Sequence, residues 1–384
     1  MKTILITGAT GFVGSSLSME FLRKKNRVIA LSRNDPGGAR TRQVVRAAAN
    51  GFEVSPTAIN LDLLDVIEVD YCNLQALLKN ENFKGIDEVW HCAAEMTYNP
   101  KKLEKAIQQN LTNTFQLYKI IAENTKCRRF YHVSTAYTTG VQKLRASEDL
   151  HLDPVLINPY QVSKWGAEMT LSRAAEVYGL PVSIFRPSVV VGHEHTGWHG
   201  SSQFGFYSFL NGLCFAKYLW TENIQIGLNP AAEANLIPVD YLCRQALQLS
   251  ERPNGPTPVE IFHSVAKKSL KIDQFAQLIN EELGLKIQLS PPTNRISQII
   301  QKKIEKNSTF ANLKIDFSTT KIRAAIGEDY TEFHMNSVII RHLIQKYLQS
   351  YKNSRRHLVH LDSLKAQFTR MIHVKEKMWN LLIS

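Results

Sequence analysis

The chain has 384 residues, of which 44% are hydrophobic and 21% charged, ordinary values for a globular protein with one large or two modest cores. Its net charge of +12 suits anionic ligands, but nucleic acid is not expected because no nucleic-acid-binding motif accompanies the charge. The five cysteines form no C-x-x-C pair, and no run of about 18 apolar residues indicates a transmembrane segment. We therefore expect a cytoplasmic protein with reduced thiols, for which peripheral membrane contact stays open.

The beginning of the chain predicts a strand, a glycine-rich turn and a helix. An apolar run at 3–7 leads into Thr-Gly-Ala-Thr-Gly-Phe-Val-Gly at 7–14, and helical spacing follows over 14–24. This order of elements binds a dinucleotide pyrophosphate at the helix N-terminus. The first glycine allows the tight turn, the second lets backbone approach a phosphate, and the third lets the helix pack closely on the strand. We assign cofactor binding to Gly8, Thr10, Gly11, Phe12, Val13 and Gly14.

Alternating strand and helix patterns predict an α/β fold with a doubly wound parallel sheet of the Rossmann type. Strands are expected at 3–7, 27–32, 66–70, 87–92 and 129–134, and a helix at 101–123. A sixth strand at 182–186, a return segment at 236–240, a helix at 241–250 and a strand at 259–264 follow. Tyr160 and Lys164 are four residues apart in a segment with helical spacing, so both should project from one helix face.

Three motifs occur in order: the glycine turn, the hydroxyl residues Ser134 and Thr135 after a buried strand, and the Tyr160–Lys164 pair. Up to about residue 265 the chain resembles the extended short-chain dehydrogenase/reductase superfamily. The segments 163–168, 178–182 and 185–187 are most similar to its thioester-reductase and fatty acyl reductase branch. The resemblance implies that Tyr160 is the general acid and Lys164 its electrostatic partner. It also implies that Thr135, with Ser134 as the alternative, bonds the substrate oxygen.

The acid needs help from its surroundings, because the reference pKa of tyrosine is near 10. We expect the ammonium of Lys164 to lower the pKa of Tyr160, so that the phenol exchanges a proton with a developing alkoxide. In the family that this chain resembles, the lysine also binds the nicotinamide ribose.

The second strand ends in Ser32 and Arg33, where an NAD enzyme of this fold would carry an acidic residue for the ribose 2′-OH. A guanidinium suits a 2′-phosphate, so we expect NADPH (NADP+), with Arg40 and Arg42 assisting. Asp35 is expected to belong to an Asp-Pro-Gly-Gly turn instead. Family register implies further positions at the cofactor: Asp70 at the adenine, Ala93 and Ala94 close to the cofactor, Asn110 as a structural asparagine, and Pro187, Ser188 and Val189 around the nicotinamide.

The superfamily builds its substrate site in the segment that corresponds to 192–235, which is rich in aromatic residues here. Core packing explains any one of them, but together they indicate an apolar cleft. They are Phe204, Phe206, Tyr207, Phe209, Phe215, Tyr218 and Trp220.

A histidine-rich stretch precedes these aromatics. His193, Glu194, His195 and His199 lack the H-E-x-x-H spacing and lie in a glycine-containing loop, so no metal is expected. We favour a place for Trp198 or a histidine at the mouth of the substrate site.

The predicted domains are a Rossmann domain at 1–190, to which 236–265 return, and a smaller, mostly helical substrate subdomain at 191–235 and 266–335. A basic amphipathic tail at 336–384 carries nine Lys or Arg against two acidic residues. The tail is interpreted mainly as a helix that caps the substrate subdomain. Recruitment of an acidic carrier is the alternative. The expected apolar face of its helix comprises Val338, Ile339, Leu343, Ile344, Tyr347, Leu348 and Tyr351.

The resemblance implies an NADPH-dependent reductase that converts an acyl thioester to an aldehyde or alcohol. Since the sequence shows neither an adenylation nor a carrier domain, the thioester is expected on coenzyme A or on a separate acyl carrier protein. The alternatives are a hydroxy/keto lipid or steroid dehydrogenase, a nucleotide-sugar epimerase or dehydratase, and a non-catalytic cofactor-binding protein. The aromatic cleft disfavours the sugar, and the intact Thr135, Tyr160 and Lys164 disfavour the non-catalytic protein. The acyl group and the oligomeric state stay open.

Overall fold

The computed structural model describes residues 1–142, 144–200, 202, 204–218, 223–253, 255 and 257–355. Residues Met1–Ile344 form one compact unit and Gln345–Ser384 a second. Among the described residues, no helix has both the length and the apolar character needed to cross a bilayer.

A parallel sheet organises the first unit, and it confirms the expected doubly wound α/β fold. Its strands are β1 (Thr3–Thr7), β2 (Arg27–Ser32), β3 (Leu64–Glu68), β4 (Glu88–His91), β5 (Arg129–Val133), β7 (Val182–Pro187) and β11 (Val259–Ser264). They lie in the order β11-β7-β5-β4-β1-β2-β3, and every neighbouring pair is parallel. The strand order reverses beside β1, and in open α/β sheets ligands bind at the carboxyl ends of the strands near such a point.

Helices cover both faces of the sheet, so its strands are apolar on both sides. One face packs against α1 (Phe12–Arg23), α2 (Ala39–Gly51), α8 (Val239–Glu251) and the short α11 (Thr320–Ile326). The other packs against α3 (Glu81–Lys84), α5 (Asn113–Asn124) and α6 (Pro159–Tyr178). Alternation along β1 shows the two cores directly, since Ile4 and Ile6 face the first layer and Leu5 the second. Residues 320–326 thus pack on the sheet, although they fall in the predicted substrate subdomain.

Three local features differ from the sequence expectations. The third strand ends at Glu68, not at residue 70. The helix expected over 101–123 is divided into α4 (Leu103–Ile107), a π-helical turn (Gln108–Thr112) and α5. Helix α2 was not predicted from the sequence. Helices commonly begin after a Ser, Thr, Asp or Asn that caps the first turn, but α2 begins after Gly37 and Gly38, two glycines with positive φ.

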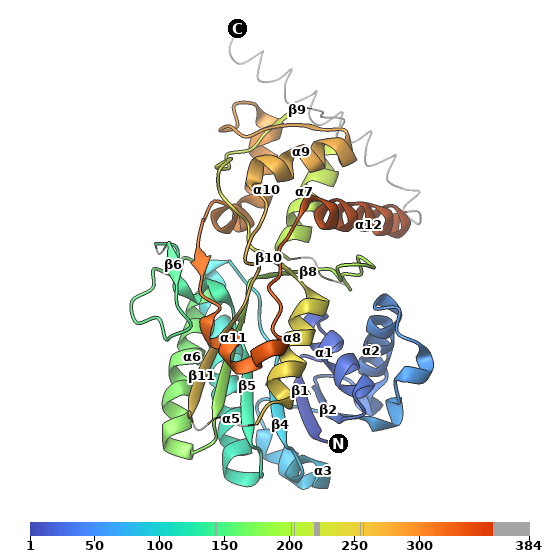
Figure 1. Ribbon diagram of the computed structural model, residues 1–384, viewed down its shortest axis with the longest axis vertical. Helices are drawn as coiled ribbons and strands as arrows, with labels where there is room; N and C mark the ends of the chain where they lie inside the picture. The colour runs from blue at the N-terminus through green and yellow to red at the C-terminus, as the bar shows by residue number, and fades with distance from the viewer. Residues whose placement is uncertain are drawn as a thin grey trace. The chain divides into compact units, whose positions relative to one another are not determined.

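A second group of elements gathers at the end of the unit beyond the strands' carboxyl ends (Figure 1). It comprises α7 (Phe206–Tyr218), α9 (Ile272–Leu283), α10 (Arg295–Ala311) and the parallel pair β9 (Asn223–Gln225) and β12 (Lys286–Gln288). Two further parallel pairs connect this group with the sheet: β8 (Val189–Val191) with β10 (Leu236–Pro238), and β6 (Arg145–Ala146) with β13 (Asp316–Phe317).

The predicted tail begins as helix α12 (Ser337–Arg355), and residues 356–384 lie outside the described part of the chain. Within the first unit, Ile339 and Leu343 are buried, as the helical pattern predicts. Ile340, which is not part of the predicted face, is also buried, and Val338, which is part of it, is 75% exposed. The guanidinium of Arg341 pairs with the carboxylate of Glu282 at 2.8 Å, and also with Glu281. The start of α12 is thereby attached to α9.

The close contact between α1 and the turn before it generates a stability prediction. A Cβ at Gly14 would lie 2.2 Å from the carbonyl oxygen of Gly8, a contact that backbone atoms cannot relieve cheaply. We expect Gly14→Ala to lower the free energy of unfolding by about 1–3 kcal/mol, despite the better helix propensity of alanine. Urea-induced unfolding measures the change.

Gly85→Ala is the matched control, because the nearest atom to its added Cβ lies 3.9 Å away. It should leave the midpoint of unfolding nearly unchanged. Equal midpoints for the two variants would show that the contact at Gly14 is unimportant.

Candidate functional site

A cavity of about 1350 Å³ lies along the carboxyl edge of the sheet and continues into the group formed by α7, α9 and α10. Six strands bring residues to it at or just after their ends, because the carboxyl ends of parallel strands meet at one edge. The corresponding lining residues are Gly8, Ser32, Glu68, His91, Thr135 and Pro187.

The glycine turn forms one wall of this cavity, and all six residues assigned to it line the space together with Ala93 and Ala94. Gly8 has a φ of +70°, and a Cβ there would lie 2.8 Å from the amide nitrogen of Ala93. No side chain caps the first turn of α1, so its free N–H groups are available to an anion. This wall fits a dinucleotide pyrophosphate.

Two arginines line the cavity where β2 ends. Nη2 of Arg40 donates to Oγ of Ser32 at 3.2 Å and also to the carbonyl of Arg33. Nη1 of Arg33 donates to Oε1 of Gln109 at 3.1 Å. Arg42 does not line the cavity, because its guanidinium donates to the carbonyl of Leu61 at 3.1 Å. The structure therefore brings Ser32, Arg33 and Arg40 together and leaves Arg42 aside.

Asp35 is turned away from this group. Its carboxylate accepts from the amides of Arg40 and Thr41 and from Oγ1 of Thr41, at 2.6–3.0 Å. Burial opposes the charge, but these bonds outweigh it and hold the pKa of Asp35 below its ordinary value. The carboxylate nearest in sequence to the ribose position thus caps the start of α2.

Asp70 lines the cavity near the carboxyl end of β3, two residues beyond the last residue of that strand. It is exposed, and its Oδ1 accepts the amide N–H of Cys72 at 2.9 Å. Burial raises the pKa of the neighbouring Tyr71 to about 12, so that phenol stays neutral.

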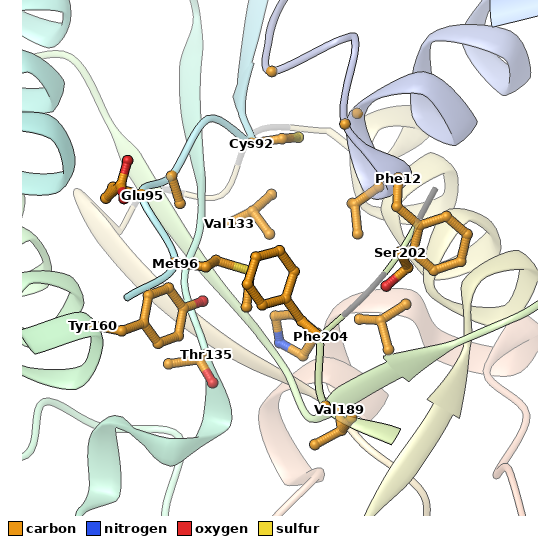
Figure 2. Close-up of a pocket in the computed structure, with 18 of the residues that line it drawn as sticks. Phe12, Cys92, Glu95, Met96, Val133, Thr135, Tyr160, Val189, Ser202 and Phe204 are labelled. Carbon is orange, nitrogen blue, oxygen red and sulfur yellow. The ribbon is translucent and has the colours of Figure 1, made fainter. Parts of the chain in front are cut away.

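Thr135 and Tyr160 lie side by side in the wall of the cavity (Figure 2). The phenol of Tyr160 points into the space, and its backbone N–H is held by the carbonyl of Thr97 at 3.1 Å. The hydroxyl of Thr135 accepts the amide of Tyr137 at 3.3 Å. Ser134 also lines the cavity, but its hydroxyl donates to the carboxylate of Glu168. Thr135 is thus the freer of the two hydroxyls.

Lys164 lies one helical turn beyond Tyr160, and it is 1% exposed and not part of the lining. Its Nζ donates to the carbonyl of Val133 at 2.6 Å. Burial lowers the pKa of Lys164 to about 8, although Glu168 opposes this. Burial raises the pKa of Tyr160, and Tyr98 and Glu168 add to the rise. The structure therefore corrects the expected lowering of the Tyr160 pKa, and it leaves a protonated phenol that can serve as a proton donor.

Asn110 lies in the π-helical turn and is fully buried outside the cavity lining. Its Nδ2 donates to the carbonyl of Glu95 at 3.0 Å and to Oγ of Ser163 at 2.9 Å, and its Oδ1 accepts the N–H of Glu95. These bonds fix the segment after β4 against α6. Asn110 therefore joins these two segments from outside the cavity lining.

Pro187, the last residue of β7, and the two residues after it, Ser188 and Val189, also line the cavity. The hydroxyl of Ser188 is buried and has no hydrogen-bond partner among the described residues. An orphaned polar atom in this place fits a ligand with an amide or hydroxyl group, as a nicotinamide would supply.

The rest of the cavity is apolar, and no charged side chain of the described residues beyond Val190 lines it. Phe204, Phe206 and Phe209 contribute to it, whereas Tyr207 is buried outside the lining with its hydroxyl accepting the N–H of Gly192 at 2.7 Å. The side chains of Phe215 and Tyr218, and all of Trp220, lie outside the described part. The other large apolar lining residues are Ile226, Leu228, Ile272, Phe275, Ile279, Ile287, Leu289 and Phe310.

Several lining residues near the catalytic pair had no sequence signal. The rings of Tyr98 and Tyr160 have centroids 6.5 Å apart, and Phe310 of α10 lies 6.3 Å from Tyr98 and 5.0 Å from Tyr137. Met96 lies beside Tyr160 in Figure 2. These side chains come from segments far apart in sequence, and only the fold brings them together.

The histidine-rich loop is not at the substrate mouth. Trp198 packs against Phe12 and Phe52, with ring centroids 5.5 and 5.6 Å apart, and neither it nor His193, His195 or His199 lines the cavity. Within the ranges that the structure describes, no three His, Cys, Asp or Glu residues are grouped to hold a metal ion. The loop therefore attaches the substrate half to α1 and α2.

The burial of Lys164 generates a pH prediction. Its ordinary pKa of 10.5 is lowered to about 8 in the folded protein, so between these values the folded state binds fewer protons than the unfolded chain. Raising the pH through this window relieves a cost to folding. We expect the stability of the wild type relative to Lys164→Met to rise by about 2–3 kcal/mol between pH 7 and pH 10.

Urea-induced unfolding of both proteins at the two pH values gives this difference, and titrations common to both proteins cancel in it. If the difference in stability between the two proteins does not change with pH, folding does not lower the pKa of Lys164.

Comparison with known proteins shows that the chain is similar to parts of several reductases. The family model for male sterility protein matches residues 6–246. The L-2-aminoadipate reductase large subunit of Eremothecium gossypii is 24% identical over 388 residues, which are 91% of this chain and 27% of that protein. Fatty acyl-CoA reductase 1 of Gallus gallus is 32% identical over 172 residues, 41% of this chain and 31% of that protein. The chain thus matches less than a third of the length of either relative.

A solved thiolation-reductase di-domain from an archaeal non-ribosomal peptide synthetase has a TM-score of 0.71 at 20% identity, over 92% of this chain and 76% of that one. At this identity the likeness is one of fold. The family match covers more than half of the residues and agrees with the geometry of the cavity. The chain therefore belongs to the male sterility protein family, in the thioester-reductase and fatty acyl reductase branch of the extended short-chain dehydrogenases/reductases, and contains an NAD(P)-binding domain.

Proposed function

We propose that this protein uses NADPH to reduce an acyl thioester with an apolar acyl group to an aldehyde, or onward to an alcohol. The observation that carries the proposal is the continuity of one cavity, in which the glycine turn, the Thr135–Tyr160 pair and the apolar chamber follow one another. A dinucleotide would occupy only the part of the cavity between the glycine turn and the Thr135–Tyr160 pair. The large apolar part calls for a second ligand that is itself apolar.

The catalytic residues have separate tasks in this reaction. Bound NADPH supplies the hydride that reduces the thioester carbonyl. Thr135 and Tyr160 hold the carbonyl oxygen, on which negative charge grows, and the Tyr160 phenol gives it a proton. The resulting hemithioacetal breaks its C–S bond, which releases an aldehyde and a thiol. The raised pKa of Tyr160 keeps the proton on the phenol at neutral pH until this charge develops.

Lys164 lies behind the lining of the cavity and acts through the backbone of β5. Its Nζ bonds the carbonyl of Val133, the residue before Ser134 and Thr135, so it fixes the end of β5. Its family role at the nicotinamide ribose remains part of the proposal.

The substrate arrives on a thiol carrier, either coenzyme A or an acyl carrier protein. Relatives and neighbours include both a fatty acyl-CoA reductase and a reductase joined to a thiolation domain. A hydroxy or keto lipid would also fit an apolar chamber, and it would be oxidised or reduced without release of a thiol.

The two arginines at the end of β2 predict the cofactor preference. Arg33 and Arg40 line the cavity beside Ser32, so each should bond a 2′-phosphate. We expect tighter binding of NADPH than of NADH, and a loss of about 10- to 100-fold in that preference for Arg33→Ala or Arg40→Ala. Fluorescence titration of both cofactors measures it.

Arg42→Ala is the control, because Arg42 lies in the same helix but bonds Leu61 outside the cavity. It should keep the preference. Equal affinity of the wild-type protein for the two cofactors would contradict the assignment.

The reaction is tested with a series of acyl thioesters of increasing chain length. Each methylene buried in the chamber contributes about 0.8 kcal/mol, so kcat/KM should rise about fourfold per methylene until the chamber is full. NADPH consumption should be matched by thiol release.

The assignment of the general acid is tested with two tyrosine variants. Tyr160→Phe should lower kcat about 100-fold or more, because it removes the proton donor. Tyr98→Phe removes a hydroxyl from the neighbouring ring and should stay active.

Two outcomes would oppose the proposal. Consumption of cofactor with a secondary alcohol and no thiol release would favour the hydroxy/keto lipid enzyme. Normal turnover by Tyr160→Phe would show that the catalytic residues are assigned wrongly.

A further inference from the structure

A second cavity, of about 500 Å³, lies outside the site described above. It is formed around the β6–β13 pair and the beginning of α11. Its side chains are mainly basic or hydroxylic, in contrast to the apolar chamber. They are Arg145, Ser147, Lys267, Asp316, Phe317, Ser318, Thr319, Thr320 and Arg323, with Ala146 completing the wall.

The charge of this lining is not balanced by the protein. Three cationic side chains face the cavity and one carboxylate, Asp316, accompanies them. Arg323 is paired with Glu332, but no ion pair of Arg145 or Lys267 occurs among the described residues. The amides of Lys321 and Ile322 at the start of α11 are already bound by Glu148, so the helix end adds nothing here. Asp316 lies opposite Arg145 in the β6–β13 pair, so Arg145 and Lys267 together leave one net positive charge. The hydroxyl of Ser318 donates to that of Thr320 at 3.1 Å, which holds both hydroxyls in place. A net positive charge beside positioned hydroxyls suits a phosphate.

The second cavity is separated from the catalytic pair by one layer of side chains. Phe317 lines the second cavity, and its ring lies 5.9 Å from that of Tyr137, which lines the main one. The amide of Tyr137 in turn bonds the hydroxyl of Thr135. The second cavity therefore lies directly behind the part of the main cavity's wall that Tyr137 forms, next to Thr135.

We propose that the second cavity binds the phosphate at the end of a phosphopantetheine arm. This inference rests on the proposed function, because an acyl thioester on coenzyme A or on a carrier protein has its sulfur at one end of that arm and a phosphate at the other. Arg145 and Lys267 bind the phosphate, and the hydroxyls of Ser318 and Thr320 complete its surroundings. The acyl chain lies in the apolar chamber.

Direct binding tests this site without any reaction. Phosphopantetheine and pantetheine differ only in the phosphate, and calorimetry should show about 10- to 100-fold tighter binding of the phosphorylated form. The double variant Arg145→Ala/Lys267→Ala should abolish this difference. The control Lys79→Ala/Lys126→Ala removes two exposed cations that line neither cavity and should preserve it. Equal binding of the two probes by the wild type, or an undiminished difference in the Arg145/Lys267 variant, would overturn the proposal.

Kinetics with three thioesters of one acyl group identify the source of the phosphate. The Arg145/Lys267 variant should raise KM for acyl-CoA, for the acyl carrier protein, or for both, by about 10-fold, and leave acyl-pantetheine unchanged. A rise for one carrier assigns the phosphate to that carrier, and no rise for either overturns the site. If no thioester is reduced at all, the proposed function fails, and the binding experiment still decides on the phosphate site.

Discussion

The catalytic half of the molecule depends on one buried ion pair. Arg186 of β7 donates to both carboxylate oxygens of Glu168 in α6, at 2.6 and 3.0 Å, and both side chains are fully buried. The same carboxylate accepts the hydroxyls of Ser134 and Thr138, which flank Thr135. One interaction thus joins the helix that carries Tyr160, the end of β5 and the neighbouring strand. Such a pair contributes little net stability, but leaving one partner alone costs about 3–5 kcal/mol, so the three elements are held together.

The Arg186–Glu168 pair also determines which hydroxyls and charged groups of the site are bound within the protein and which can contact a ligand. Ser134 is used by Glu168, which leaves Thr135 for the ligand. Lys164 is turned to the carbonyl of Val133, and the phenol of Tyr160 is protonated by virtue of its burial. The polar residues that fit a nucleotide lie at one end of the cavity and uncharged apolar residues at the other. The order of the elements in the sheet therefore sets the order of the ligands that we propose.

The residues that could be predicted from sequence are those whose roles depend on local spacing. The glycine turn, the Tyr160–Lys164 pair and the parallel sheet all follow from short motifs or periodic patterns. The sequence could not predict that Arg40 lines the cavity and that Arg42 does not, because this depends on where α2 begins. The two glycines before α2 carry no sequence signal for the start of a helix. The direction of the Tyr160 pKa shift depends on burial by distant segments, which a motif does not contain. The same holds for Phe310, which reaches the catalytic pair from α10.

The central claim is that one cavity holds cofactor and acyl thioester with the thioester carbonyl at Thr135 and Tyr160. A crystal structure of the protein with NADP+ and an unreactive thioester analogue tests it most directly. We predict that the carbonyl oxygen lies within hydrogen-bond distance of both hydroxyls, with the acyl chain between α7, α9 and α10 and the 2′-phosphate at Arg33 and Arg40. An analogue bound elsewhere, or with its carbonyl turned away from Tyr160, would contradict the account.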